Sequence, residues 1–279
     1  LALHLEAGCR ALRRRLPRGD RAPSPGIGGS TARGMLTVEF DKLDLAPGSR
    51  VLDLGCGEGR HIRGTRLLAG VDAVALDLGE HEVTETRRSL VEMDEDPQAL
   101  CRAAADAGEW LVVRGDIYHL PFPDGAFDCI IASEILEHLH RDDDAIGEID
   151  RILKPGGVLA VSVPRYWPEA VCWALSTEYQ NQPGGHVRIY SGGEIPAKLS
   201  GRGMAVFDGH YAHGLHAPYW WLKCLFGLDA EPNFPDALYH RMLVWEMFDK
   251  PLLLRTLTPI VDALAGKSEV FYARKPSVA

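Results

Sequence analysis

Several features of common protein classes are missing from this chain of 279 residues. It has no apolar run near the ~20 residues that a membrane-spanning helix needs, and its N-terminus has no apolar core of the kind that a signal peptide requires. The six cysteines are scattered, with no CxxC motif and no short repeated spacing. This distribution is untypical of a disulfide framework or a zinc cage. We therefore expect a cytoplasmic protein in a reducing compartment, with no membrane span.

Positive charge is scarce outside the first 34 residues. Residues 1–34 hold seven Arg against two acids, whereas the whole chain has 30 basic and 39 acidic residues. Subtraction leaves 23 basic and 37 acidic residues in 35–279, a net charge of −14. A body that acidic repels a phosphate backbone, so we expect no nucleic-acid partner.

Residues 1–34 also lack a sustained apolar period. They contain a Pro/Gly/Ser-rich stretch from Pro23 to Gly34, and Met35 opens the first well-patterned segment. We expect a disordered or dispensable arm, or sequence upstream of the true start at Met35. The alternative is a short basic helix that rests on the domain. A single domain is expected over 35–279.

From residue 50 onward, short apolar runs alternate with longer stretches of helical spacing. This alternation predicts an α/β fold with a Rossmann-like, mostly parallel sheet of seven strands and helices on both faces. Helices are expected at Leu78–Met93 and Asp142–Leu153, and Lys154–Gly157 is expected to turn the chain into the fifth strand. The expected strands are Arg50–Leu54, Ala73–Asp77, Trp110–Arg114, Phe127–Ser133, Val158–Val163, Met204–Tyr211 and Glu269–Ala273.

Aromatic residues gather in the C-terminal part, where 17 of the 22 lie in the last 116 positions. About 55 residues separate the last two expected strands, which is too long for a hairpin loop. We expect an inserted, aromatic helical cap at about 212–266, which would bind the small molecule on which the protein acts. Within it, the run Pro218–Lys223 is an aromatic wall for a bound small molecule, the buried face of the cap, or both.

The strongest local signal is the run from Val51 to Arg60, VLDLGCGEGR. A buried strand leads into three alternate glycines, which let the backbone turn tightly and approach a ligand. The loop lacks the GxGxxG spacing of dinucleotide sites and carries Asp53 and Glu58, which would repel a pyrophosphate. Asp77 ends the second strand, where a ribose-binding acid belongs in such folds. The acids therefore favour a cofactor that carries positive charge.

Further motifs follow at matching places along the chain. They are AVALDL (73–78), RGDIYHLPFPDGAFD (114–128), CIIASEILEHL (129–139) and RILKPGG (151–157). With these motifs the chain resembles the class I methyltransferases that use S-adenosylmethionine (SAM), in the small-molecule group called type 11. The resemblance covers about 37–165, and it departs from the family in the inserted segment Asp94–Gly108. SAM carries an ammonium and a sulfonium, which suit the acids of the loop.

The resemblance implies a role for each residue that matches a motif. Gly55 and Gly57 would cradle the methionine part of SAM, with Asp53 beneath its amino group, and Asp77 would hold the ribose hydroxyls. Asp116 would accept from the adenine amine. The full set expected to bind the cofactor is Asp53, Gly55, Cys56, Gly57, Gly59, Asp77, Leu78, Asp116, Ile117, Ser133 and Glu134, the last two around the transferred methyl group.

Methyl transfer needs alignment and exclusion of water, and it needs a base only when the acceptor must lose a proton. His138 and His186 are the candidate bases, and His138 is preferred because it follows the fourth strand. Either histidine has an alternative structural role. No metal is expected, because His210, His213 and His216 do not share one helical face. The run Asp142–Asp144 is expected to favour a helix N-terminus.

The sequence therefore predicts a SAM-dependent methyltransferase acting on a small molecule. The expected acceptor atom is an oxygen of a bacterial metabolite, such as a glycoside, polyketide or glycolipid precursor. Alternatives are an N- or C-methyltransferase and a non-catalytic SAM-binding protein on the same fold. A dinucleotide-dependent oxidoreductase is a further rival, and the acids around the glycine loop disfavour it.

Overall fold

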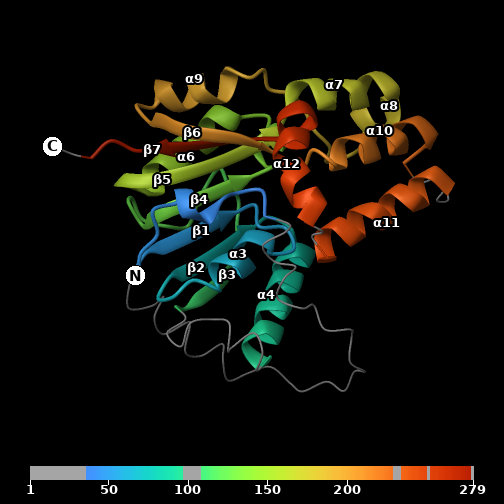
Figure 1. Ribbon diagram of the computed structural model, residues 1–279. Coiled ribbons are helices and arrows are strands. Elements are labelled where there is room, and N and C mark those ends of the chain that lie inside the picture. Colours follow the sequence, from blue (N-terminus) through green and yellow to red (C-terminus); the bar gives the residue numbers. More distant parts are fainter. Residues whose placement is uncertain (1–35, 97–107, 229–233, 250–251, 278–279) are drawn as a thin grey trace.

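The computed structural model describes residues 36–96, 108–228, 234–249 and 252–277 (Figure 1). The expected arm at 1–34 lies outside these residues, as does most of the insertion at Asp94–Gly108. A seven-stranded sheet with the order β3-β2-β1-β4-β5-β7-β6 forms the centre. Its strands are β1 (Arg50–Leu54), β2 (Asp72–Asp77), β3 (Trp110–Arg114), β4 (Phe127–Ser133), β5 (Leu153–Pro164), β6 (Ala205–Ala212) and β7 (Ser268–Arg274).

Neighbouring strands among β1 to β5 are parallel, whereas β7 is antiparallel to both β5 and β6. The predicted fold class and the seven strands are therefore confirmed. The chain leaves β1 first towards β2 and β3, and later returns to place β4 on the other side of β1. Ligands of doubly wound sheets bind beyond the carboxyl ends of the strands at such a reversal point. The site is therefore expected above β1 and β4.

Helices cover both faces of the sheet because strand side chains alternate between the faces. Leu52 of β1 packs in one cluster with Ile146 and Leu199, from two helices on one face. Ala75 of β2 packs in another cluster with Val83, from the opposite face. The helices on the two faces are α6 (Asp142–Ile152) and α9 (Glu194–Gly201), and α3 (Arg60–Thr65) and α4 (Glu80–Glu95).

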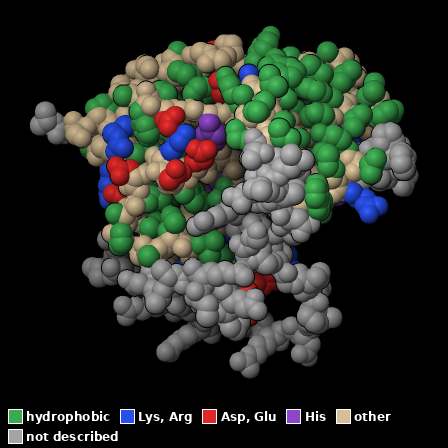
Figure 2. All heavy atoms as spheres, in the orientation of Figure 1, with side chains coloured by type: hydrophobic (Ala, Val, Ile, Leu, Met, Phe, Trp, Pro, Cys, Tyr) green, Lys and Arg blue, Asp and Glu red, His purple; other side chains and the backbone are tan. Residues whose placement is uncertain are grey.

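A second group of helices lies beyond the carboxyl ends of the strands. It comprises α7 (Tyr166–Leu175), α8 (Thr177–Gln180), α10 (His216–Phe226), α11 (Phe234–Asp249) and α12 (Leu252–Ala265). The last three lie between β6 and β7 in the chain. Figure 2 shows hydrophobic side chains gathered over α7 and α10, where Tyr166, Leu225 and Phe226 are exposed. Among the described helices, none has the length and hydropathy that crossing a membrane requires.

One local prediction was wrong. Lys154–Gly157 do not separate the helix from the fifth strand, because β5 already begins at Leu153 and contains them. Gly156 has a φ of +80°, and its N–H donates to the carbonyl of Lys275. The glycine thus bends the strand while its backbone stays in the ladder, with a register shift against β4. The four cysteines of the described residues are all buried and free.

Candidate functional site

Three glycines with left-handed backbone shape the loop after β1. Their φ angles are +70° at Gly55, +51° at Gly57 and +79° at Gly59, values that other residues rarely adopt. A Cβ at Gly55 would lie 2.2 Å from Cδ1 of Ile135, which follows β4. The loop therefore sits tightly against the end of β4, at the reversal point of the sheet.

Asp53 lies beneath this loop with only 2% of its surface exposed. Its Oδ2 accepts the backbone N–H of Ile62 at 2.9 Å. Burial raises the pKa of Asp53 to about 7, although the bond from Ile62 and the charge of Arg60 act in the opposite direction. A nearby cationic group would favour ionisation of this carboxyl.

Asp77 at the end of β2 accepts hydrogen bonds from the glycine loop and from the start of the segment that follows β2. Its Oδ2 accepts the N–H of Gly57 and its Oδ1 accepts the N–H of Gly79, both at 2.9 Å. Next to it, Leu78 leaves 66% of its surface exposed, although it is large and apolar. Cys56 is buried, and burial raises the pKa of its thiol to about 12, so it is a neutral part of the loop.

The end of β3 brings two more expected residues to the same edge. Asp116 Oδ1 accepts the N–H of Tyr118 at 3.0 Å, and its other oxygen lies 3.7 Å from Nδ1 of His119. Ile117 is buried at 7% exposure. Because β1, β2 and β3 are parallel neighbours, these residues and Asp77 lie at the same end of the sheet.

The end of β4 holds Ser133 and Glu134 in a short hydrogen-bonded chain. Ser133 Oγ lies 2.8 Å from Ser162 Oγ, and Ser162 Oγ donates to Oε1 of Glu134 at 2.9 Å. Glu134 has a φ of +54°, which is uncommon for a residue other than glycine. Ser133 is buried and supports this arrangement, while Glu134 faces a cavity.

This cavity measures about 320 Å³ and lies next to the glycine loop. Arg60, at the end of the loop, and Glu134 both line it. Its other polar walls come from segments far apart in the sequence. They include Glu137, His138, His186, His213, His216, Trp220 and Lys267.

The two candidate bases meet in this cavity, with ring centroids 4.9 Å apart. Nδ1 of His138 lies 2.9 Å from the carbonyl of Gly184, and Nδ1 of His186 lies 2.7 Å from Oε1 of Glu169. Because both partners accept, each Nδ1 carries the proton and each neutral ring keeps a lone pair on Nε2. Burial and the neighbouring His186 lower the pKa of His138, which favours the neutral ring.

Two carboxylates in this region were missed by sequence reasoning. Glu169 of α7 is 1% exposed and orients His186. Burial acts to raise the pKa of Glu169, but the bond and charge of His186, together with Lys267 and Tyr179, lower it overall. Glu137 is completely buried, and neither of its carboxylate oxygens has a hydrogen-bond partner among the described residues. Burial and the charge of Glu134 raise its pKa well above the usual range. The motif around His138 contains Glu137, but nothing in the sequence indicates its burial.

Hydrogen bonds between two loops hold the histidines side by side. The N–H of Val187 donates to the carbonyl of Glu137 at 2.9 Å, and Arg188 donates to the carbonyl of Leu139 at 2.8 Å. Arg188 also pairs with Asp142 in the first turn of α6. The run Asp142–Asp144 does begin a helix, as expected, and its first residue is in addition a structural anchor.

The other histidines are not gathered into a metal cluster within the described part of the chain. Nε2 of His210 lies 3.1 Å from the carbonyl of Thr37, while His213 contacts the hydroxyl of Thr37 at 3.0 Å. Burial lowers the pKa of His216 to about 4. In the aromatic run of α10, Trp220 lines the cavity and Trp221 donates to the carbonyl of Pro168. The run therefore combines a pocket wall with a packing face.

Known proteins are similar to part of this chain. A family model described as a methyltransferase domain matches residues 52–161. A sterol 24-C-methyltransferase of Schizosaccharomyces pombe is 30% identical over 148 residues, which are 53% of this chain and 34% of that protein. A demethylmenaquinone methyltransferase of Parafrankia sp. is 38% identical over 128 residues, 45% of this chain and 50% of that protein. The chain thus spans about a third to a half of the length of these relatives.

Solved structures extend the likeness in fold beyond the matched core. A SAM-dependent methyltransferase of Methanosarcina mazei superposes with a TM-score of 0.52 at 13% identity, covering 84% of this chain and 95% of that one. At this identity the likeness concerns the fold alone. Residues 52–161 therefore match a methyltransferase domain, and the chain has the fold of the SAM-dependent methyltransferases.

Proposed function

We propose that the chain transfers the methyl group of SAM to a hydroxyl oxygen of a small molecule. The observation that carries this proposal is the position of the histidine-lined cavity beside the glycine loop, because Arg60 at the end of the loop and Glu134 at the end of β4 both line it. A cofactor on the loop would then present its methyl group to the cavity. Two imidazoles in the cavity have an Nε2 lone pair that could accept the proton of the acceptor hydroxyl.

The cofactor would lie along the carboxyl ends of β1 to β4. Asp53 would face its ammonium, and the carboxylate of Asp77 would accept from the ribose hydroxyls. Leu78 and Ile117 would contact the adenine ring, whose amine would donate to Asp116. The unusual exposure of Leu78 supports this arrangement, because a flat apolar ligand would cover it.

The reaction is an in-line displacement at the methyl carbon. The acceptor oxygen would form a bond to carbon while the carbon–sulfur bond breaks, and the bonding electrons would return to sulfur. The hydroxyl proton would pass to Nε2 of His186 and later to water. We favour His186 over the initially preferred His138, because buried Glu169 holds its Nδ1 proton and would stabilise the imidazolium.

The shape and chemistry of the cap favour an acceptor with two unlike parts. The cavity wall is charged and polar, which suits a hydroxylated group such as a sugar or a phenol. The helices around it expose large apolar side chains, which suit a polyketide or lipid portion. We therefore propose that 212–266 bind a bacterial glycoside, polyketide or glycolipid precursor.

The proposal is tested with purified chain, SAM labelled on the methyl group and a fractionated cell extract as the source of acceptors. Formation of S-adenosylhomocysteine together with a labelled small molecule is expected, and the label should be on oxygen. A label on nitrogen or carbon would contradict the oxygen assignment. Carbon is a real alternative, because the sterol relative named above is a C-methyltransferase. Binding of SAM without turnover in any fraction would indicate a non-catalytic role. Thermal stabilisation by NADH but not by SAM would identify a dinucleotide enzyme instead.

A further inference from the structure

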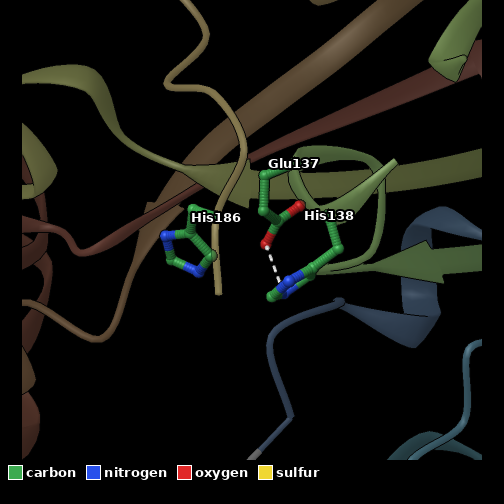
Figure 3. A group of neighbouring side chains, drawn as sticks. All are labelled: Glu137, His138 and His186. Carbon is green, nitrogen blue, oxygen red and sulfur yellow. Dashed lines mark ion pairs between the residues drawn. The ribbon is translucent and has the colours of Figure 1, made fainter. Parts of the chain in front are cut away.

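Three potential metal ligands converge at one wall of the cavity. Glu137 and His138 come from the short helix η2 (Leu136–His138), and His186 comes from the loop before α9. One ligand atom from each lies within 4.8 Å of the others. Figure 3 shows Glu137 and His138 facing each other with His186 beside them. The residues are 49 positions apart at most, and their spacing follows no metal-binding motif.

The two imidazoles are already oriented as metal ligands usually are. A ligating histidine generally donates its second ring N–H to a carboxylate or a backbone carbonyl. Glu169 takes this role for His186 at 2.7 Å, and the carbonyls of Gly184 and Gly185 take it for His138 at 2.9 and 3.2 Å. Both Nε2 lone pairs are therefore available at the cluster, without a change of tautomer.

Glu137 supplies an independent observation. Its side chain is completely buried, and both carboxylate oxygens lack a hydrogen-bond partner among the described residues. Oε1 lies 3.9 Å from Nε2 of His138. A buried polar group without a partner is costly, and such a group often marks a functional site or an unseen ion. A cation between the carboxylate and the imidazoles would satisfy it.

The donor set selects among ions. Two imidazoles and one carboxylate suit zinc and related transition ions, whereas magnesium and calcium prefer oxygen ligands. Zinc bonds of ~2.0–2.2 Å place ligand atoms within ~3.5 Å of one another, so the cluster would contract by about 1 Å. The cavity leaves further coordination positions open.

We propose that Glu137, His138 and His186 form a three-ligand site for a divalent ion of the zinc class, and that this ion competes with proton acceptance at Nε2. The competition between metal binding and proton acceptance rests on the proposed methyl transfer. An imidazole whose lone pair is bound to zinc has no site for the acceptor's proton. Metal binding therefore inhibits turnover, and the metal-free protein is the active form.

The binding test uses the full chain after treatment with a chelator, with Co²⁺ and Zn²⁺ as probes. Calorimetry is expected to show one tight site, and bound Co²⁺ is expected to give the visible absorption of a four- or five-coordinate ion. Glu137→Gln, which keeps the side-chain shape, and His138→Ala should each weaken binding more than tenfold. Glu169→Gln should weaken it by ~10–100-fold, because it removes the partner of a ligand. His81→Ala, an exposed histidine on α4, is the matched control and should leave binding unchanged.

Several outcomes would overturn the proposal. Equal metal affinity in the wild type, Glu137→Gln and His138→Ala would show that these residues are not the ligands. Loss of binding only in His213→Ala would show the same. Circular dichroism of each variant separates loss of a ligand from loss of the fold. Tight binding without inhibition of SAM turnover would refute the competition. Absence of turnover in the metal-free chain would refute the proposed function. The metal site would still be tested independently, by calorimetry and by the absorption of bound Co²⁺.

Discussion

Asp53 is a buried carboxyl whose ionisation is expected to couple folding to cofactor binding. Burial raises its pKa from 3.8 to about 7, while the pKa in the unfolded chain is about 3.9. Below pH ~4 the carboxyl is protonated in both the folded and the unfolded state, so its raised pKa does not change the free energy of unfolding. As the pH rises from ~4 to ~7, the unfolded state loses its proton while the folded state still holds it, so the raised pKa of Asp53 lowers the stability of the fold.

The size of the effect follows from the shift. Roughly three pH units at ~1.4 kcal/mol each correspond to ~4 kcal/mol, lost between pH ~4 and ~7 and constant above that range. Asp53→Asn removes the titration, and its Oδ1 can still accept the N–H of Ile62. The variant should therefore gain stability relative to the wild type as the pH rises. At ~2–4 °C per kcal/mol, its melting temperature should exceed that of the wild type by on the order of 10 °C at pH 7.

Cofactor binding should respond in the opposite direction. If the ammonium of SAM lies beside Asp53, binding favours the ionised carboxylate and releases a proton. Affinity in the wild type should therefore increase from pH 5 to 7, and Asp53→Asn should bind SAM more weakly and without this increase. Thermal unfolding and calorimetry in two buffers of different ionisation enthalpy measure both effects. A stability difference that does not change with pH would refute the reasoning about burial, and unchanged SAM affinity would remove Asp53 from the site.

Three further expectations concern the cofactor, metal dependence and the base. Asp77→Ala should weaken SAM binding by ~1–3 kcal/mol, because it removes the ribose acceptor and the bonds to Gly57 and Gly79; calorimetry on a folded variant that binds SAM normally would contradict this. Turnover should persist or rise after dialysis against a chelator, and loss of activity restored by added zinc or magnesium would show the opposite. His186→Ala should lower kcat by ~100- to 10,000-fold while SAM affinity barely changes, and the wild-type increase of rate with pH should be lost. If both His186→Ala and His138→Ala keep a near-normal kcat, methyl transfer depends on proximity alone, and the acceptor atom needs no base.

The strands that carry the cofactor edge were predicted well because their signal is local. β1, β3 and β4 have the predicted bounds, and β2 begins one residue earlier than predicted. A buried parallel strand reads as a continuous apolar run, and the loop after β1 needs glycines wherever φ is positive. Apolar periodicity was less accurate for the start of the following helix, which was predicted at Leu78, whereas α4 begins at Glu80.

The acid–histidine pairs of the cavity could not be predicted in the same way. Glu169 and His186 are 17 positions apart, in a helix and a loop whose relative placement has no periodic signal. Glu137 could equally have been an exposed residue of a turn, as charged residues usually are. Its burial depends on the loop around Val187, whose backbone binds that of Glu137 itself.

The sequence by itself determined the α/β fold, the order of the strands along the chain and the sheet edge that carries the proposed cofactor residues. These follow from apolar periodicity and from backbone angles that only glycine adopts easily, both of which act over a few residues. Only the tertiary structure decided that His138 and His186 share a cavity with a buried, unpartnered Glu137. The physical reason is that these contacts arise where two irregular loops dock through backbone hydrogen bonds, and backbone groups are the same in every residue.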